Sequence, residues 1–387
     1  MSEFDEIRPY NDSEVVPTLQ RLLEDKEFLD TVAKLSLPKA GKYIAPLVRG
    51  LIRSRLQKET ASIQTVADLQ AKIEFYLGRE INRTITHLSI SGLDNFDRAK
   101  ASLFVSNHRD IVMDPALVNW SLYKNGFTTL RIAIGDNLLT KPFASDLMRL
   151  NKSFIVNRSA TAPREKLKAA KLLSKYIHHS VLTDNENVWI AQREGRAKDG
   201  IDVSNQAIIS MFALSKPKTQ PFEEFIREAR IVPVTLSYEY DPCDTAKAKE
   251  IYQKETEGTY KKGEHEDVKS IATGITGFKG CVHVHFGEPL TQNFENAEQV
   301  KLHLDKEIIS NYVLHPSNCI AYEMLEKRSP KVLVGEKQIA FDTADWQAER
   351  KIFADRIATC DPQHLNTLLK GYANPVYRKL SLTANAE

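Results

Sequence analysis

The chain has 387 residues with 53 basic and 51 acidic side chains, so its net charge of +2 excludes the strongly basic character of a nucleic-acid-binding protein. Its four cysteines are far apart and form no Cys-x-x-Cys pair, which indicates neither a zinc site nor a disulfide framework. The first residues carry acids where a signal peptide needs bases, and no run reaches the roughly 18 apolar residues of a transmembrane helix.

Residues 1–83 have apolar side chains at three- and four-residue spacing, which predicts a helical N-terminal region. Thr65 and Asp68 match a capping box and predict a helix start there. Residues 42–58 combine apolar and basic side chains in an amphipathic pattern. This stretch either docks on an anionic lipid surface or an acidic protein, or packs on the core as an ordinary helix.

Residues 84–300 alternate short apolar runs with helical patterns, which predicts an α/β fold with a mixed sheet covered by helices. Helices are expected at 115–124 and 163–179. The expected strands are 103–106, 131–134, 153–156, 188–191, 231–237 and 281–286.

The charged segment 244–270 is predicted to lie at the surface, without chemistry of its own. Residues 301–387 are predicted to form a helical C-terminal region. The helices expected toward this end of the chain are 298–311, 319–327, 345–358 and 364–369.

The segment 106–115, Ser-Asn-His-Arg-Asp-Ile-Val-Met-Asp-Pro, follows an expected strand and precedes an expected helix, where α/β folds place reacting groups. His108 suits general-base catalysis near neutral pH, and either Asp110 or Asp114 can orient its ring. Asp114 is favoured, although an N-cap role before Pro115 also explains it. Ser106 lacks the Gly-x-Ser-x-Gly setting of a serine nucleophile.

This segment resembles the first motif of the glycerolipid acyltransferase family, which includes glycerol-3-phosphate and lysophosphatidate acyltransferases. Three further segments resemble the family's later motifs, in the family's order: 152–158, 192–200 and 231–234. The resemblance covers residues 86–290 and implies an acyltransferase core with this fold at 84–300. It departs from the family in two places. Five residues, instead of four, separate His108 from Asp114, and the third motif lacks a small residue between Gly195 and Arg196.

The resemblance implies that His108 and Asp114 are catalytic. It implies an acceptor-binding role for six other residues, with Lys198 as a weaker candidate. Chemistry allows this, because guanidinium groups and a glycine turn can bind phosphate oxygens. No metal is expected, and His283 and His285 are interpreted as structural because a third ligand is missing. The six predicted acceptor-binding residues are Asn107, Arg109, Arg158, Glu194, Gly195 and Arg196.

The implied reaction moves a fatty acyl group from acyl-CoA or acyl carrier protein to a hydroxyl of lysophosphatidate or glycerol 3-phosphate. No cofactor is required beyond the donor. The enzyme is expected to act as a peripheral protein on the cytoplasmic membrane face. Two alternatives stay open: another lysolipid, such as a lysophospholipid or an amino-acid-containing lipid, as the acceptor, or a non-catalytic lipid-binding scaffold of the same fold.

Overall fold

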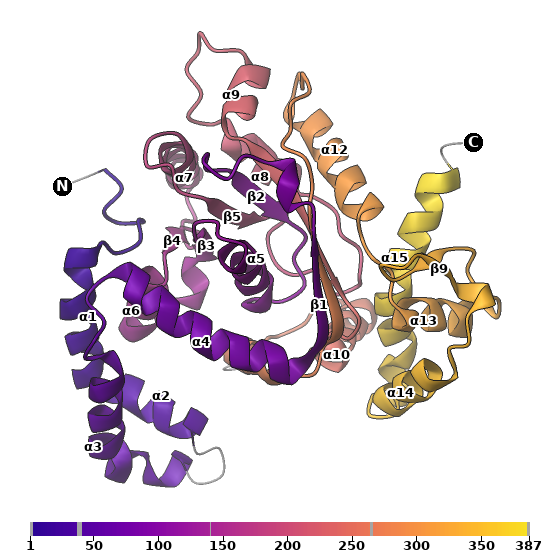
Figure 1. Ribbon diagram of the computed structural model, residues 1–387, viewed down its shortest axis with the longest axis horizontal. Coiled ribbons are helices and arrows are strands. Elements are labelled where there is room, and N and C mark those ends of the chain that lie inside the picture. The colour runs from indigo at the N-terminus through magenta and orange to yellow at the C-terminus, as the bar shows by residue number, and fades with distance from the viewer. Residues whose placement is uncertain (1–2, 37–40, 140, 264–265, 385–387) are drawn as a thin grey trace. The chain divides into compact units, whose positions relative to one another are not determined.

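The computed structural model describes residues 3–36, 41–139, 141–263 and 266–384 (Figure 1). The chain divides into two compact units. Unit 1 consists of Met1–Gly78 and Leu130–Tyr176, and unit 2 consists of Arg79–Thr129 and Ile177–Glu387. These units cut across the regions predicted from the sequence, because residues 130–176 belong with the N-terminal helices.

Unit 1 contains helices and one pair of parallel strands, β3 and β4. Its hydrophobic cluster has Val15, Leu22, Ile63 and Leu150 as buried members. The predicted capping box is confirmed, since the Asp68 N–H donates to Thr65 Oγ1 (3.1 Å) and the Thr65 N–H donates to Asp68 Oδ2 (2.9 Å). The elements are α1 (Asp12–Glu24), α2 (Lys26–Ser36), α3 (Gly41–Thr60), most of α4 (Val66–Thr84), β3 (Arg131–Gly135), α6 (Pro142–Leu150), β4 (Ser153–Val156) and the start of α7 (Pro163–Leu182).

Helix α3 contains the amphipathic stretch predicted at 42–58. Leu47 and Leu51 on this helix are 82% and 73% exposed, so these two leucines do not pack on a core. The side chains of residues 42–46 lie outside those described. Arg49 is held by Asp30 of α2, with a 2.5 Å contact between Nε and Oδ1.

The sheet of unit 2 is mixed, which confirms the predicted α/β fold class. Its hydrogen-bonded order is β1 (Ile85–Ser91), β7 (Gly280–Phe286), β6 (Ile231–Tyr238), β2 (Leu103–Ser106) and β5 (Val188–Ala191). Strands β1 and β7 are parallel, β7 and β6 are antiparallel, and β2 is parallel to both β6 and β5. The ends of β2 and β5 are in register, with Ser106 opposite Ala191, so the loops that follow them emerge together.

Strand β2 and strand β6 are buried along their whole length, as continuous apolar runs predict for central strands. Strand β1 was missed by the sequence prediction, because its half-exposed face alternates polar residues such as His87 and Ser89 with apolar ones. Figure 1 shows α5 (Met113–Lys124) on one side of these strands and α12 (Ala297–Ser310) on the other.

The C-terminal helices share a hydrophobic cluster that includes Phe353, Leu368 and Tyr372. They are α13 (Pro316–Glu326), α14 (Gln347–Ile357) and α15 (Leu365–Ala384), and a two-stranded hairpin, β8 (Leu333–Val334) with β9 (Ile339–Ala340), lies between α13 and α14 in sequence. Helix α15 extends well beyond the predicted end at residue 369. Among the described residues, no helix has the length and apolar content needed to span a membrane.

The charged segment 244–270 is not confined to the surface, which corrects the sequence interpretation. It forms α10 (Asp244–Glu257) and the first part of α11 (Glu266–Thr276), while residues 264–265 lie outside those described. Lys247 and Glu250 of α10 are buried. Glu250 pairs with Lys198 of the loop after β5, and Lys247 pairs with Asp241 of the loop after β6. Most other charged residues of the segment are exposed, as predicted. The remaining helices of unit 2 are α8 (Gln206–Phe212), α9 (Phe222–Glu228) and the end of α7.

Candidate active site

His108 and Asp114 are joined at the end of β2. The His108 Nδ1 lies 2.8 Å from Asp114 Oδ2. The carboxylate is completely buried, whereas the imidazole side chain retains 14% exposure. Asp114 is therefore the residue that orients His108, as favoured from the sequence, and the ring keeps one accessible edge.

Four donors surround the Asp114 carboxylate. Oδ2 accepts from His108 Nδ1 and from the backbone N–H groups of Arg109 (2.6 Å) and Asp110 (2.9 Å), while Oδ1 accepts from the Tyr238 hydroxyl (2.8 Å). Burial, followed by the charge of Asp114, raises the pKa of Tyr238 well above its ordinary value, so this hydroxyl remains a donor. Because a carboxylate only accepts, Nδ1 must carry the proton, which leaves the Nε2 lone pair free to act as a base.

Asp110 supplies the cap of α5, in place of the N-cap role considered for Asp114. The helix begins at Met113, two residues earlier than predicted, and Asp110 Oδ1 accepts from the N–H groups of Val112 (3.0 Å) and Met113 (2.9 Å). Burial, and then the charge of Asp114, raises the pKa of Asp110. Its carboxylate packs against Gly274 of α11, where an added Cβ would lie 2.1 Å from Oδ2.

Trp189 of β5 forms a wall beside the imidazole. Its ring meets the His108 ring edge-on, with centroids 6.0 Å apart and an interplanar angle of 71°. The indole Nε1 donates to Ser106 Oγ (3.0 Å), and that hydroxyl donates to the Asn107 carbonyl (2.7 Å). Ser106 is completely buried, in agreement with the sequence argument against a serine nucleophile.

The loop that follows β5, residues 192–200, lies directly beside His108. The Gln192 N–H donates to the Ser106 carbonyl (2.8 Å), and the Ala197 N–H donates to the His108 carbonyl (2.7 Å). Between these two anchors, Glu194 and Gly195 are exposed. Gly195 has a φ of +72° and no atom within 4 Å of a Cβ placed on it, so backbone at this turn is open to a ligand.

Arg196 immediately precedes the Ala197 anchor, which places a guanidinium-bearing residue next to the His108 backbone. Among the described residues, no hydrogen bond or ion pair engages its side chain. Lys198 differs, because it forms an ion pair with Glu250 of α10, and burial lowers its pKa. Arg196 thus has the donors available for a phosphate, whereas Lys198 is already committed to a carboxylate.

Asn107 and Arg109, both predicted to bind the acceptor, are bonded within the protein. Asn107 is completely buried, exchanging two hydrogen bonds with the backbone of Leu236 (2.8 and 2.9 Å) and donating to Asp202. The Arg109 guanidinium is paired with Asp202 (2.6 Å) and also donates to the Gly200 carbonyl (3.0 Å). These contacts join the loop after β2 to β6 and to the third-motif loop, and they give no support to acceptor binding by Asn107.

Arg158 belongs to unit 1, whereas His108 and Arg196 belong to unit 2. It is exposed just after β4, and its backbone N–H donates to Asp136 Oδ1 (3.0 Å). Arg158 also packs close to Gly135 of β3, where an added Cβ would lie 3.0 Å from its Cδ and Nε. Its role in acceptor binding stays a prediction.

Three functional partners were not found from the sequence: Tyr238, Asp202 and Lys247. The Lys247 ammonium donates to the Arg109 carbonyl (2.6 Å) and pairs with Asp241. All three are far in sequence from the residues they support, and no local pattern marks them. Their only signal is position, since Tyr238 directly follows the strand predicted at 231–237 and Asp202 follows the third motif.

The histidines of β7 have local partners. His283 lies 2.7 Å from Ser89 Oγ through Nδ1, and His285 lies 2.8 Å from Ser91 Oγ through its own Nδ1. Within the described part of the chain, no group of three or more His, Cys, Asp or Glu residues is arranged to hold a metal ion.

Comparisons with known proteins agree with this geometry. Residues 87–237 match the family model described as Acyltransferase, a segment that begins in β1 and ends in β6. This segment of the chain is therefore similar to proteins of the acyltransferase family. A glycerol-3-phosphate acyltransferase of Pseudomonas putida is 27% identical over 278 residues, which is 65% of this chain and 31% of that protein. The match thus spans about a third of the length of that family member.

A solved structure, the 1-acyl-sn-glycerophosphate (LPA) acyltransferase PlsC from Thermotoga maritima, is 12% identical to this chain. The alignment covers 73% of this chain and 95% of that structure, with a TM-score of 0.36. The match to the Acyltransferase family model includes His108, Asp114 and Arg196, but it does not include α10 or the C-terminal helices.

Proposed function

We propose that the chain is an O-acyltransferase of phospholipid biosynthesis. It moves a fatty acyl group from acyl-CoA or acyl carrier protein to a hydroxyl of glycerol 3-phosphate or lysophosphatidate. The observation that carries this proposal is the buried Asp114 carboxylate, which fixes a His108 tautomer with a free Nε2 beside a third-motif loop whose Arg196 is unengaged. The glycerol-3-phosphate acyltransferase named among the similar proteins supports this class of acceptor.

In the proposed reaction, His108 Nε2 takes the proton of the acceptor hydroxyl as its oxygen attacks the thioester carbonyl carbon. The tetrahedral intermediate then breaks its carbon–sulfur bond, and the leaving thiolate takes the proton from the imidazolium. An ester and a free thiol are formed, with no cofactor and no net proton change. Asp114 stabilises the transient imidazolium without itself taking the proton.

Arg196 supplies the phosphate-binding group of this proposal, aided by the open turn at Gly195 and by Glu194, which orders the basic groups or accepts from the acceptor hydroxyl. An arginine fork can donate two parallel hydrogen bonds to phosphate oxygens. Arg158 is proposed as a second phosphate ligand on the strength of the family resemblance alone. Asn107 is assigned to positioning His108, because its side-chain amide bonds within the protein. Arg109 is assigned to the same task through its Nε and Nη2 atoms, which bond to Asp202 and to the Gly200 carbonyl.

The test is the release of free thiol by the purified full chain, with acyl-CoA and acyl carrier protein as separate donors. Acceptors should include glycerol 3-phosphate, lysophosphatidate, a zwitterionic lysophospholipid and an amino-acid-containing lysolipid. We expect His108→Ala to lose about 10²- to 10⁴-fold in turnover with acceptor binding retained, because the base acts only on the reacting proton. His87→Ala, at a residue whose side chain is 63% exposed, is the matched control.

An unchanged turnover number in His108→Ala would refute the assigned base. Vesicle binding without thiol release from either donor would instead favour a non-catalytic lipid-binding scaffold. Faster transfer to the zwitterionic lysophospholipid or the amino-acid-containing lysolipid would identify that lipid, instead of glycerol 3-phosphate or lysophosphatidate, as the acceptor. This comparison of acceptors is informative because the third motif lacks the small residue that the family has before the arginine, here Arg196.

We further propose that the protein works as a peripheral protein on the cytoplasmic face of the membrane. The support is α3, where exposed Leu47 and Leu51 lie on a helix that also exposes Arg53, Arg55 and Lys58. Such a helix can bury leucines among lipid chains while its bases contact anionic headgroups. Leu47→Glu/Leu51→Glu should reduce sedimentation with anionic vesicles and leave thiol release from soluble substrates unchanged. Equal sedimentation of variant and parent would contradict this.

A further inference from the structure

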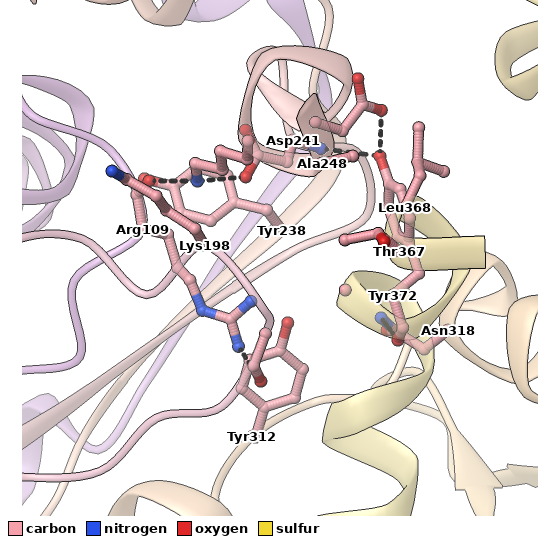
Figure 2. A pocket seen from close by; sticks show the side chains of 14 residues that line it. Arg109, Lys198, Tyr238, Asp241, Ala248, Tyr312, Asn318, Thr367, Leu368 and Tyr372 are labelled. Atoms are coloured by element: carbon pink, nitrogen blue, oxygen red, sulfur yellow. Dashed lines mark hydrogen bonds and ion pairs between the residues drawn. The ribbon is translucent and has the colours of Figure 1, made fainter. Parts of the chain in front are cut away.

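A polar pocket lies behind the catalytic loop, on the side of Arg109 (Figure 2). It contains about 510 Å³ of space, part of it open to solvent. Figure 2 shows Arg109 and Tyr312 facing Thr367, Leu368 and Tyr372 of α15 across this space. Neither His108 nor Arg196 lines the pocket, so it is separate from the groups assigned to acyl transfer.

The two carboxylates of the pocket have their oxygen atoms engaged by the protein. Asp241 pairs with Lys247 through Oδ2 and accepts from the Cys243 N–H through Oδ1 (2.8 Å). Asp244 accepts from Arg356 Nε (2.7 Å) and the Tyr372 hydroxyl (2.7 Å) through Oδ2, and from the Thr245 N–H (2.7 Å) through Oδ1. Each carboxylate is thus matched with a cation and with hydrogen-bond donors, which reduces its repulsion of an incoming anion.

The unused hydrogen-bonding capacity of the pocket consists of donors. Arg109 uses Nε and Nη2 on Asp202 and the Gly200 carbonyl, and no acceptor among the described residues engages Nη1. The Arg109 guanidinium lies over the Tyr312 ring, with Cζ 5.5 Å from the ring centroid. The Tyr312 hydroxyl lies near the Tyr238 backbone N–H, which is a donor, so the proton of the hydroxyl is available to a ligand. Thr367 adds a hydroxyl without a partner among the described residues.

One more ammonium group than carboxylate gathers close to the pocket. Glu250 accepts from Lys198, which lines the pocket, and from the half-exposed Lys254, which does not. Leftover donors and leftover positive charge both favour a ligand rich in acceptor oxygens. A wholly apolar occupant would leave Arg109 Nη1 desolvated without a partner, which costs free energy.

We propose that this pocket binds a phosphate group, held by Arg109 Nη1, the Tyr312 hydroxyl and the Thr367 hydroxyl. The ligand is either free phosphate or the phosphate of a small ester. Its site is coupled to the base through Arg109, whose backbone N–H donates to Asp114 and whose carbonyl accepts from Lys247.

The experiment is isothermal titration of the purified full chain carrying Arg196→Gln, which removes the phosphate ligand assigned to acyl transfer. Inorganic phosphate and glycerol 3-phosphate are the two titrants. We expect one remaining site, weakened about tenfold by Tyr312→Phe and about tenfold by Thr367→Val, because each change deletes one hydrogen bond to a charged ligand. Tyr322→Phe, a buried tyrosine of α13 that does not line the pocket, should leave the affinity unchanged.

Tighter binding of glycerol 3-phosphate would identify a phosphate ester as the ligand, and equal binding would identify free phosphate. The proposal is overturned if neither titrant binds at millimolar concentration, or if both donor deletions leave the affinity unchanged. It is also overturned if Tyr322→Phe weakens binding as much as Tyr312→Phe does. The readout is binding alone, so its result does not depend on the proposed acyltransferase activity.

Discussion

The loop at residues 106–114 and the loop at residues 192–200 follow neighbouring parallel strands. The polar groups of the first loop are bonded within the protein, whereas those at the turn of the second are open to solvent. In the first loop, Asn107, Arg109, Asp110 and Asp114 all bond to protein partners. In the second, Glu194 and Gly195 are exposed at the turn 194–196. Among the described residues, no hydrogen bond or ion pair engages the side chain of Arg196. This difference suits the roles proposed for His108 and Arg196, because a base must be held in one geometry whereas a phosphate ligand must be reachable.

Asp114→Asn is the most severe test of the loop at residues 106–114, called the rigid loop below. An amide in place of the carboxylate can stabilise the wrong imidazole tautomer and cannot support the imidazolium, so turnover should fall about 10³- to 10⁴-fold. The measurement is the turnover number for thiol release, with Asp342→Asn at an exposed site as the control. A loss smaller than about tenfold would mean that the carboxylate does not control His108.

Asn107→Ala should damage the fold rather than acceptor binding. It removes both hydrogen bonds to Leu236 and the one to Asp202, leaving buried groups unpaired, so the free energy of unfolding should fall by about 2–4 kcal/mol. Denaturant unfolding measures this, with exposed Asn366→Ala as the control. A raised KM for the acceptor at unchanged stability would restore the binding role predicted from the sequence.

Arg196→Gln should impair acceptor binding and leave the stability of the fold unchanged. We expect the KM for a phosphate-bearing acceptor to rise about 10- to 100-fold, as loss of a charged hydrogen-bond donor predicts, while stability stays within about 0.5 kcal/mol of the parent. Steady-state kinetics and denaturant unfolding on the same preparations separate the two effects. Arg328→Gln at an exposed position is the control, and an equal rise in its KM would show that only overall charge matters.

Gly195→Ala should have the smallest effect. An alanine at a φ of +72° costs about 1 kcal/mol in backbone strain, but its Cβ meets no atom, so the KM should rise only a few-fold. Gly274→Ala is the matched comparison, since its Cβ would lie 2.1 Å from Asp110 and should destabilise the rigid loop more. Steady-state kinetics and denaturant unfolding of both variants test this difference. It would be refuted if Gly195→Ala proved more damaging than Gly274→Ala.

The sequence was sufficient for the residues whose roles are local. Strands β2, β4 and β5 have their predicted bounds because uninterrupted apolar runs mark buried strands, and the pairing of His108 with Asp114 was favoured correctly. The internal hydrogen bonds of Asn107 and Arg109 could not be predicted, because a polar residue in a loop has the same local pattern whether it bonds a ligand or a distant strand. Lys247 was missed for the same reason, since its partners are brought close only by the fold.

The close approach of Gly200 and Gly371 limits how the chain can be shortened. A Cβ at Gly200 would lie 2.0 Å from the Gly371 carbonyl oxygen, and Asn374 Nδ2 donates to the Asp199 carbonyl (2.6 Å), so α15 rests directly on the end of the third-motif loop. A fragment ending near residue 300 would uncover this loop and remove the α15 residues that cover it. A fragment that keeps this packing therefore includes α15, far beyond residue 237, where the match to the family model ends.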